Sequence, residues 1–329
     1  MGEWIFAGGT VVRSTGVEIA DIRVSGDTIS AVGPHLPAEG ADVIDCRGRW
    51  VFPGLVDPHT HMGIPIKQVR SRDDFASGSR AALQGGVTTL IDFTVWEARQ
   101  SLEESIRQRQ AEAASSLADV SLHANITRLE SGLADAIETA FGLGVVSFKV
   151  FTTYREAGMM LEYPQIREVA EILAVRGGVL QVHAEDDRLI QEATAPLVAA
   201  GSASPRDHGR SRPVAAEVEA IRRLGTLHDV TGCPVYIVHL SSAAGWEAAR
   251  EENLLMETCP QYLLLDERSY EAPDGHMFVA SPPLRSPEER DRLWEGIKDG
   301  SIAAVGTDHC PFCRRDKPAG LPFQDIPNG

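Results

Sequence analysis

Residues 54–61 read Gly54-Leu55-Val56-Asp57-Pro58-His59-Thr60-His61, a short apolar run that ends in two histidines separated by one residue. If the run is a buried strand, alternate side chains share a face, so His59 and His61 point the same way. Two neutral imidazoles are good ligands for one divalent metal ion, but zinc usually takes about four donors. The pair alone is also typical of a polar strand end, so the rest of the chain must supply further donors.

After Pro53 the sequence alternates between strand-like and helix-like stretches, which is typical of parallel βα units. Amphipathic helical stretches are predicted at 73–84, 102–114, 163–175 and 214–227. The strand candidates are 55–57, 87–92, 120–124, 145–150, 179–183, 235–239, 254–257 and 302–306. Eight strands close a TIM (β/α)8 barrel, so we predict an α/β barrel domain over residues 53–329.

The first 52 residues have a different rhythm, with short strand-like runs separated by glycines and polar steps and no room for a helix. Strands are predicted at 4–7, 11–12, 19–24, 29–32 and 43–45. We predict that residues 1–52 form part of a small β-sandwich domain.

The composition limits the classes of function. The chain has 329 residues, 43% of them hydrophobic, which is enough for a large core. Its net charge of −16 argues against nucleic acid or an anionic membrane as a partner and suits a small neutral substrate. Five scattered cysteines fit free thiols in a reducing compartment, and no secretory leader or membrane-length apolar run is visible. These features predict a cytoplasmic protein.

The unusual polar residues fall where the predicted barrel strands end, which is where barrel enzymes carry their chemistry. Taken singly, His183 and His239 could be packed core histidines, and Asp308 could cap a loop. Their joint position on one rim of one barrel favours a shared site. The candidate residues are His59, His61, Lys149, His183, His239 and Asp308.

Lys149 is informative because it lies between Phe148 and Val150, where an unpaired ammonium is costly. Burial and nearby cations would lower its pKa and leave some neutral amine. Such an amine can add carbon dioxide and become a carbamate, an anionic group able to bridge two metal ions. The alternatives are a lysine that extends to the rim or one that pairs with Asp308.

The charges suit two divalent ions, with His59, His61 and Asp308 on one ion, His183 and His239 on the other, and a carbamate on Lys149 between them. Two ions about 3.5 to 4 Å apart lower the pKa of a bridging water and polarise a carbonyl. Hydrolysis of an unactivated amide by a metal-bridging hydroxide requires both effects. Zinc is the predicted metal, with manganese as the alternative.

Several motifs resemble those of the dihydropyrimidinase and D-hydantoinase family of the amidohydrolase superfamily, and they span essentially the whole chain. They are FPGLVDPHTHM, GGVTTLIDF, SFKVFTTY, VHAEDD, SRPVAAEVEAI, VHLSS, ETCPQYL, SPPLR, VGTDHCPF and IPNG. The resemblance implies a hydrolase of carbon–nitrogen bonds that opens dihydropyrimidines and hydantoins to N-carbamoyl amino acids. It also implies a homotetramer.

The resemblance assigns roles to individual residues. All six candidates match the family's metal ligands, with Lys149 as N6-carboxylysine. Asp308 would also move a proton from the bridging water to the leaving nitrogen. Tyr154 matches the tyrosine whose hydroxyl donates to the oxyanion, although it could be an ordinary loop aromatic. Ser281 and Asn328 match positions whose backbone groups hold the ring amide.

The chain departs from the family at two places. Met62-Gly63-Ile64-Pro65-Ile66 replaces the usual acidic or amide residue followed by Pro-Phe, in a loop that shapes the pocket for the ring substituent. Family members also continue beyond the point corresponding to Gly329, so we expect the β domain to be incomplete without a carboxyl-terminal segment. Gly63 stands where dihydroorotase has an arginine, whereas allantoinase remains an alternative, as does a non-catalytic scaffold relative.

The remaining cysteines and histidines have simpler interpretations. Cys310-Pro311-Phe312-Cys313 has metal or redox spacing but no second pair, so we interpret it as structural. His309 is expected beside the metal ligands without being one. His123 is expected to be packed. Solvent exposure is expected for His35, His208, His228 and His276.

Overall fold

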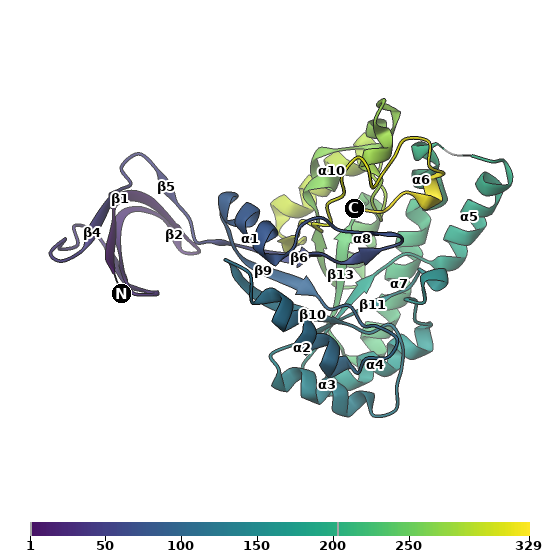
Figure 1. Ribbon diagram of the computed structural model, residues 1–329, viewed down its shortest axis with the longest axis horizontal. Helices are drawn as coiled ribbons and strands as arrows, with labels where there is room; N and C mark the ends of the chain where they lie inside the picture. The colour runs from purple at the N-terminus through teal and green to yellow at the C-terminus, as the bar shows by residue number, and fades with distance from the viewer. Residues whose placement is uncertain (1, 203) are drawn as a thin grey trace. The chain divides into compact units, whose positions relative to one another are not determined.

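The computed structural model describes residues 2–202 and 204–329. The chain divides into two compact units, Met1–Leu55 and Val56–Gly329. Figure 1 shows the course of the chain through both of them. No helix among the described residues is long and apolar enough to cross a membrane.

The first unit is one five-stranded sheet in the order β3-β2-β1-β4, with β5 also paired to β1. Its strands are β1 (Glu3–Arg13), β2 (Gly16–Ser25), β3 (Thr28–Gly33), β4 (Asp42–Asp45) and β5 (Trp50–Val51). The predicted strands at 4–7 and 11–12 are one strand, because β1 continues through a shift of register between Phe6 and Gly9. Gly8 lies there with a φ of 67°, a conformation that glycine adopts without strain. The structure thus confirms a β domain, built as a single sheet.

The second unit contains eight parallel strands that pair in chain order. They are β6 (Leu55–Thr60), β9 (Val87–Phe93), β10 (Asp119–Asn125), β11 (Ser147–Phe151), β12 (Val179–His183), β13 (Val235–Leu240), β14 (Leu255–Thr258) and β15 (Ala304–Val305). Thr60 forms a parallel bridge with His309, and the His61 amide donates to the His309 carbonyl at 2.9 Å. The first strand therefore meets the segment that follows the last one, which confirms the predicted barrel.

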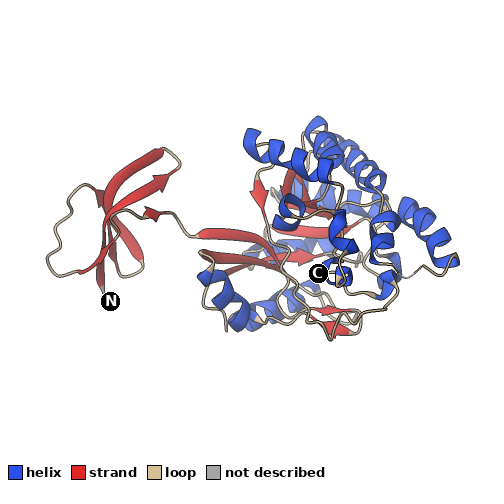
Figure 2. Cartoon of the chain, turned by 90° about the horizontal axis from the view of Figure 1, so that it is seen from above, coloured by secondary structure: helices blue, strands red, loops and turns tan. Residues whose placement is uncertain are grey.

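Helices surround these strands, as Figure 2 shows for the blue and red elements of the second unit. They are α1 (Phe75–Gln84), α2 (Leu102–Ala113), α3 (Leu133–Gly142), α4 (Tyr163–Arg176), α5 (Asp187–Ala199), α6 (Pro205–Ser211), α7 (Val214–Thr231), α8 (Ala243–Glu251), α9 (Pro260–Leu264) and α10 (Pro287–Asp299). The four helices predicted from sequence correspond to α1, α2, α4 and α7. Shorter elements are the hairpin β7 (Pro65–Ile66) with β8 (Val69–Arg70) and the 3-10 turns η1 (Arg155–Ala157), η2 (Glu267–Glu271), η3 (Gly275–Phe278) and η4 (Phe323–Asp325).

Helix ends follow local sequence rules. Ser101 caps the start of α2 through a capping box. Its side chain accepts from the Glu104 amide, and its own amide donates to the Glu104 carboxylate. Gly177 ends α4 with a φ of 71°, where a side chain would be strained. Between helices and strands lies a large apolar core, to which β11 contributes Phe148 and Val150. All five residues of β11 are buried. A strand covered on both sides reads as a continuous apolar run, which is why Lys149 stands out within β11.

Replacing Leu180 by alanine tests the barrel core. Its side chain is fully buried in β12, so Leu180→Ala should lower the free energy of unfolding by about 2–5 kcal/mol. The matched control Leu264→Ala removes the same atoms from a side chain that is 66% exposed, and should change stability by less than about 0.5 kcal/mol. Urea unfolding followed by circular dichroism measures both, and equal losses would contradict this description of the core.

Candidate metal centre and active site

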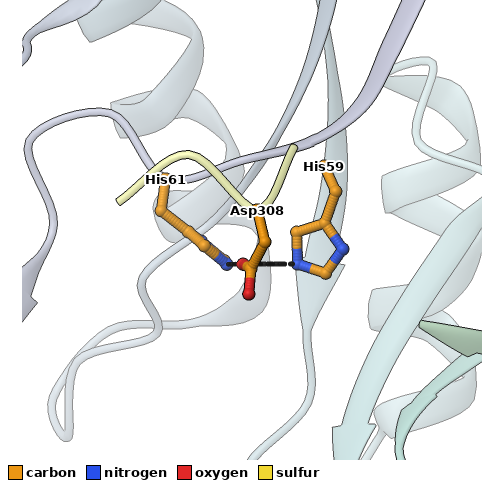
Figure 3. Close-up of side chains that lie close together, drawn as sticks. All are labelled: His59, His61 and Asp308. Atoms are coloured by element: carbon orange, nitrogen blue, oxygen red, sulfur yellow. Dashed lines mark hydrogen bonds and ion pairs between the residues drawn. The ribbon is translucent and has the colours of Figure 1, made fainter. Parts of the chain in front are cut away.

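His59, His61 and Asp308 converge at the carboxyl ends of β6 and β15, as Figure 3 shows. The Nε2 atoms of the two histidines are 3.2 Å apart. The Asp308 Oδ1 lies 3.2 Å from Nε2 of His59 and 3.1 Å from Nε2 of His61. One ligand atom from each residue lies within 4.8 Å of the others, an arrangement that can hold a metal ion.

The backbone brings these side chains together under constraint. Asp308 has a φ of 54° and His239 a φ of 41°, values that are uncommon for residues other than glycine. Gly306 precedes Asp308 closely, and a Cβ added there would lie 2.8 Å from the Cβ of His59. The end of β15 therefore approaches β6 so closely that only glycine fits. Backbone held in unfavourable conformations is common at functional sites.

A buried carboxylate fixes the orientation of His59. Glu257 on β14 is 1% exposed, and its Oε1 lies 2.5 Å from Nδ1 of His59. Its Oε2 accepts from the Tyr236 hydroxyl at 3.0 Å. With Nδ1 donating to Glu257, the Nε2 lone pair of His59 faces Asp308. Burial holds the pKa of His59 well below its usual value, so the imidazole is neutral and able to bind a metal.

His183 and His239 form a second cluster beside the first. Nδ1 of His183 lies 3.0 Å from Nε2 of His239, and the His239 ring centroid is 5.4 Å from that of His59. Nε2 of His183 lies 2.8 Å from Oε2 of Glu185, which Arg212 holds through its Nε at 3.0 Å. Burial lowers the pKa of both His183 and His239. Two neutral imidazoles thus face one point, each able to offer a lone pair.

Lys149 is only 2% exposed, and its Nζ lies 4.6 Å from the centre of the Phe93 ring. Burial lowers the pKa of its amine to about 8. Among the residues that the structure describes, none forms a hydrogen bond or ion pair with this Nζ, so the predicted alternative of a pair with Asp308 is not formed. Asp308 pairs with the two histidines instead. Burial alone would raise the pKa of Asp308, but His59, His61 and Lys149 lower it to about 2.

A cavity of about 390 Å³ opens onto five of the six candidate ligands, namely His61, Lys149, His183, His239 and Asp308. The predicted substrate-binding residues Tyr154, Ser281 and Asn328 all line it. Other lining residues include Ile64, Pro65, Ile66, Lys67, Phe151 and Met159. Tyr154 has a φ of 68°, its ring lies 4.9 Å from that of His183, and burial raises the pKa of its hydroxyl. The hydroxyl therefore stays protonated and can donate.

Sequence reasoning missed the carboxylates behind the histidines and misjudged one histidine. Glu185 follows His183 by two residues, and Glu257 is the last but one residue of β14, so a search for buried acids near histidines could have found both. His208 was expected to be solvated, which is wrong: it is 4% exposed, and its Nε2 lies 2.7 Å from the Ala280 carbonyl. That acceptor comes from a loop 72 residues away, which local sequence does not reveal.

The other expectations for histidines had mixed outcomes: His35 is exposed as expected, whereas His228 and His276 are half-buried. His123 is packed, as predicted, at 6% exposure. Nε2 of His309 lies 2.9 Å from Asp73 and outside the His59–His61–Asp308 cluster. All five cysteines are free.

A (β/α)8 barrel whose strand ends bring imidazole and carboxylate donors together is typical of metal-dependent hydrolases. The model of the amidohydrolase family matches residues 50–322. A D-phenylhydantoinase of Escherichia coli (strain SE11) is 39% identical over 338 residues, which cover 98% of this chain and 71% of that protein.

Two solved structures are also similar. The dihydropyrimidinase of Brevibacillus agri NCHU1002 matches with a TM-score of 0.95 and 34% identity, over 99% of this chain and 73% of that one. The L-hydantoinase of Arthrobacter aurescens matches with a TM-score of 0.89 and 29% identity, over 100% and 74%. The chain belongs to the amidohydrolase family, and within it to the dihydropyrimidinase and D-hydantoinase group, which confirms the resemblance noted in its sequence.

The contact between Glu257 and His59 can be tested by metal binding. Glu257→Gln keeps the size of the side chain but removes the charge that orients His59, so affinity for a divalent ion should fall about 10–100-fold. Competition with a chelator measures this directly. The control Glu251→Gln, on an exposed position at the end of α8, should leave affinity unchanged. Equal affinities in both variants would contradict the role of Glu257.

Proposed function

We propose that this chain opens cyclic amides of the dihydropyrimidine and hydantoin type by hydrolysis and releases N-carbamoyl amino acids. The observation that supports this most directly is one cavity lined by Tyr154 together with five candidate metal ligands, His61, Lys149, His183, His239 and Asp308. The names of the relatives, D-phenylhydantoinase, dihydropyrimidinase and L-hydantoinase, point to the same chemistry.

The donor set fits two divalent ions. His59, His61 and Asp308 would hold one ion, and His183 with His239 the other. Lys149, carboxylated by carbon dioxide to N6-carboxylysine, would be shared between them. Three observations support this fit: neutral imidazoles, a nearly buried lysine amine, and nitrogen and oxygen donors of the kind that zinc or manganese accepts. When bound, two such ions supply a hydroxide nucleophile at neutral pH and polarise the ring carbonyl.

The residues of the chain would then divide the remaining work. Asp308 accepts the proton of the attacking water and returns it to the ring nitrogen as the carbon–nitrogen bond breaks. The Tyr154 hydroxyl donates to the oxygen of the former carbonyl while it carries negative charge. Backbone groups of Ser281 and Asn328 hold the ring amide at the cavity wall.

The loop after His61 bears on the choice of ring. Ile64, Pro65 and Ile66 make this part of the cavity apolar. Gly63 offers no side chain to a substrate carboxylate, which disfavours dihydroorotate. The same surface suits hydantoins and dihydropyrimidines with apolar substituents better than it suits allantoin, whose substituent is polar.

Family membership further supports a homotetramer, and the free thiols suit a cytoplasmic setting.

A panel of dihydrouracil, hydantoin, 5-substituted hydantoins and allantoin, assayed with and without zinc or manganese, tests the proposed reaction. We expect ring opening with about two ions bound per chain. Lys149→Ala should lose both ions and reduce turnover by roughly a thousandfold or more, because the shared ligand is gone. Protein loaded with ¹³C-bicarbonate should show a carbamate carbon signal that this variant lacks. Activity on none of these rings would sink the proposal.

Tyr154→Phe isolates the donor to the oxyanion. We expect kcat to fall about 10²–10³-fold with unchanged metal content, because only the hydroxyl is removed. Tyr163→Phe is the matched control, since the Tyr163 hydroxyl is buried in α4 without a partner among the described residues. Steady-state kinetics with the best substrate of the panel decides between them. A kcat within about threefold of wild type in Tyr154→Phe would contradict the assigned role.

A further inference from the structure

Lys317 is a buried cation outside the metal ligands and the cavity lining. Its side chain is 1% exposed, and its Nζ donates to the carbonyls of Val279 at 2.8 Å, Gly329 at 2.5 Å and Met277 at 3.4 Å. Within the described part of the chain, no Asp or Glu side chain forms an ion pair with it. All of its polar partners there are main-chain oxygen atoms.

A buried ammonium without a side-chain counter-charge lowers the stability of the fold, which raises the question of what its hydrogen bonds provide. Burying a charge without a counter-charge is unfavourable, whereas a methionine of similar length would fill the same space without that cost. Lysine differs from methionine in bringing three donors to one point. The three acceptors come from two stretches of chain that are about 50 residues apart, so Lys317 ties separate segments together.

Both segments lead directly into the cavity wall. Ala280 and Ser281 follow Val279, and Asn328 precedes Gly329. All four of these residues, Ala280, Ser281, Asn328 and Gly329, line the cavity. The Gly329 amide donates to the Val279 carbonyl at 3.3 Å, which joins the segments a second time. Behind the first segment, His208 contacts the Ala280 carbonyl at 2.7 Å. Contacts on the outer side thus fix the backbone that faces the cavity.

The turn that carries Lys317 is fixed by contacts of its neighbouring residues. The carboxylate of the preceding residue, Asp316, accepts from Nε of Arg72 at 2.7 Å and from the Cys313 amide at 2.8 Å. The Arg72 amide donates to the Pro311 carbonyl at 2.9 Å. The turn that carries Lys317 is therefore anchored independently of the two segments that it joins.

We propose that Lys317 is a positioning residue for substrate binding: its ammonium sets the spacing between the backbone groups of Ser281 and Asn328 that hold the ring amide. Lys317 touches neither the ring nor the metal ligands. This inference rests on the proposed function, because it assumes a ring amide bound between these two positions. It assigns Lys317 to the binding of substrate rather than to the chemical step.

Lys317→Met removes the donors and keeps the length of the side chain. With the best substrate of the panel, we expect KM to rise about tenfold or more while kcat stays within about threefold, because ground-state and transition-state contacts to the ring amide are lost together. Metal content should stay at the wild-type value. Hydrogen exchange should become faster in peptides that span residues 277–281 and 326–329 and nowhere else in the barrel. Lys298→Met, on an exposed position of α10, should match wild type in all four measurements.

Three results would overturn the inference: an unchanged KM in Lys317→Met, a loss of metal, or faster exchange throughout the barrel. Lys317→Gln, which keeps a neutral donor, serves if the methionine variant does not fold; failure of both to fold would mark Lys317 as a stability residue and also overturn the inference. An inactive wild-type protein would instead contradict the proposed function. In that case unchanged exchange at 277–281 and 326–329 would still refute the ordering role of Lys317.

Discussion

The candidate site depends on the closure of the barrel through Asp57. One oxygen of this buried carboxylate accepts from the backbone amides of Thr307 at 3.0 Å and His59 at 3.2 Å, and the other accepts from the Thr307 hydroxyl at 2.6 Å. The two segments are 250 residues apart in sequence. Asp57 accepts from the amide of His59 and from the amide of Thr307, the residue before Asp308. One side chain therefore helps to set the distance between the first and last candidate metal ligands. Burial raises the pKa of Asp57, and these three hydrogen bonds oppose that rise.

A second constraint is that several groups able to carry positive charge are buried close together. His59, His183 and His239 are buried beside Lys149, and each of these cationic forms would repel the others. The chain resolves this by keeping the imidazoles neutral and by placing Glu257 and Glu185 against the nitrogens that do not face the site. A carboxylate behind a histidine fixes its tautomer and makes the opposite ring nitrogen a better metal ligand. The same two acids therefore reduce repulsion and prepare the ligands.

The sequence predicted the barrel and the positions of the candidate ligands because both depend on local patterns. Strand periodicity places His59 and His61 on one face, and the ends of successive parallel strands share one rim. The partners of those ligands depend on packing between distant segments, which periodicity does not encode. His208 illustrates the limit: its local context in α6 suggested exposure, but the loop around Ala280 covers it. The bonds of Lys317 escaped prediction for the same reason, since its acceptors are carbonyls with no sequence signature.

The lysines give this acidic protein a cavity whose local charge differs from its net charge. The chain has four lysines in a molecule of net charge −16. Lys67 and Lys149 line the cavity, and Lys317 lies behind its wall. Lys149 would lose its positive charge on carboxylation, which leaves Lys67 as the lysine cation of the lining. Lys67 donates to the carbonyls of Gln324 and Ile326, the latter at 3.0 Å, so its partners are peptide dipoles rather than a carboxylate. Such cations keep more of their field than ion-paired ones would. In the proposed reaction a neutral ring becomes a carboxylate, so the field of Lys67, which lines the cavity, would favour the charge that develops as the ring opens.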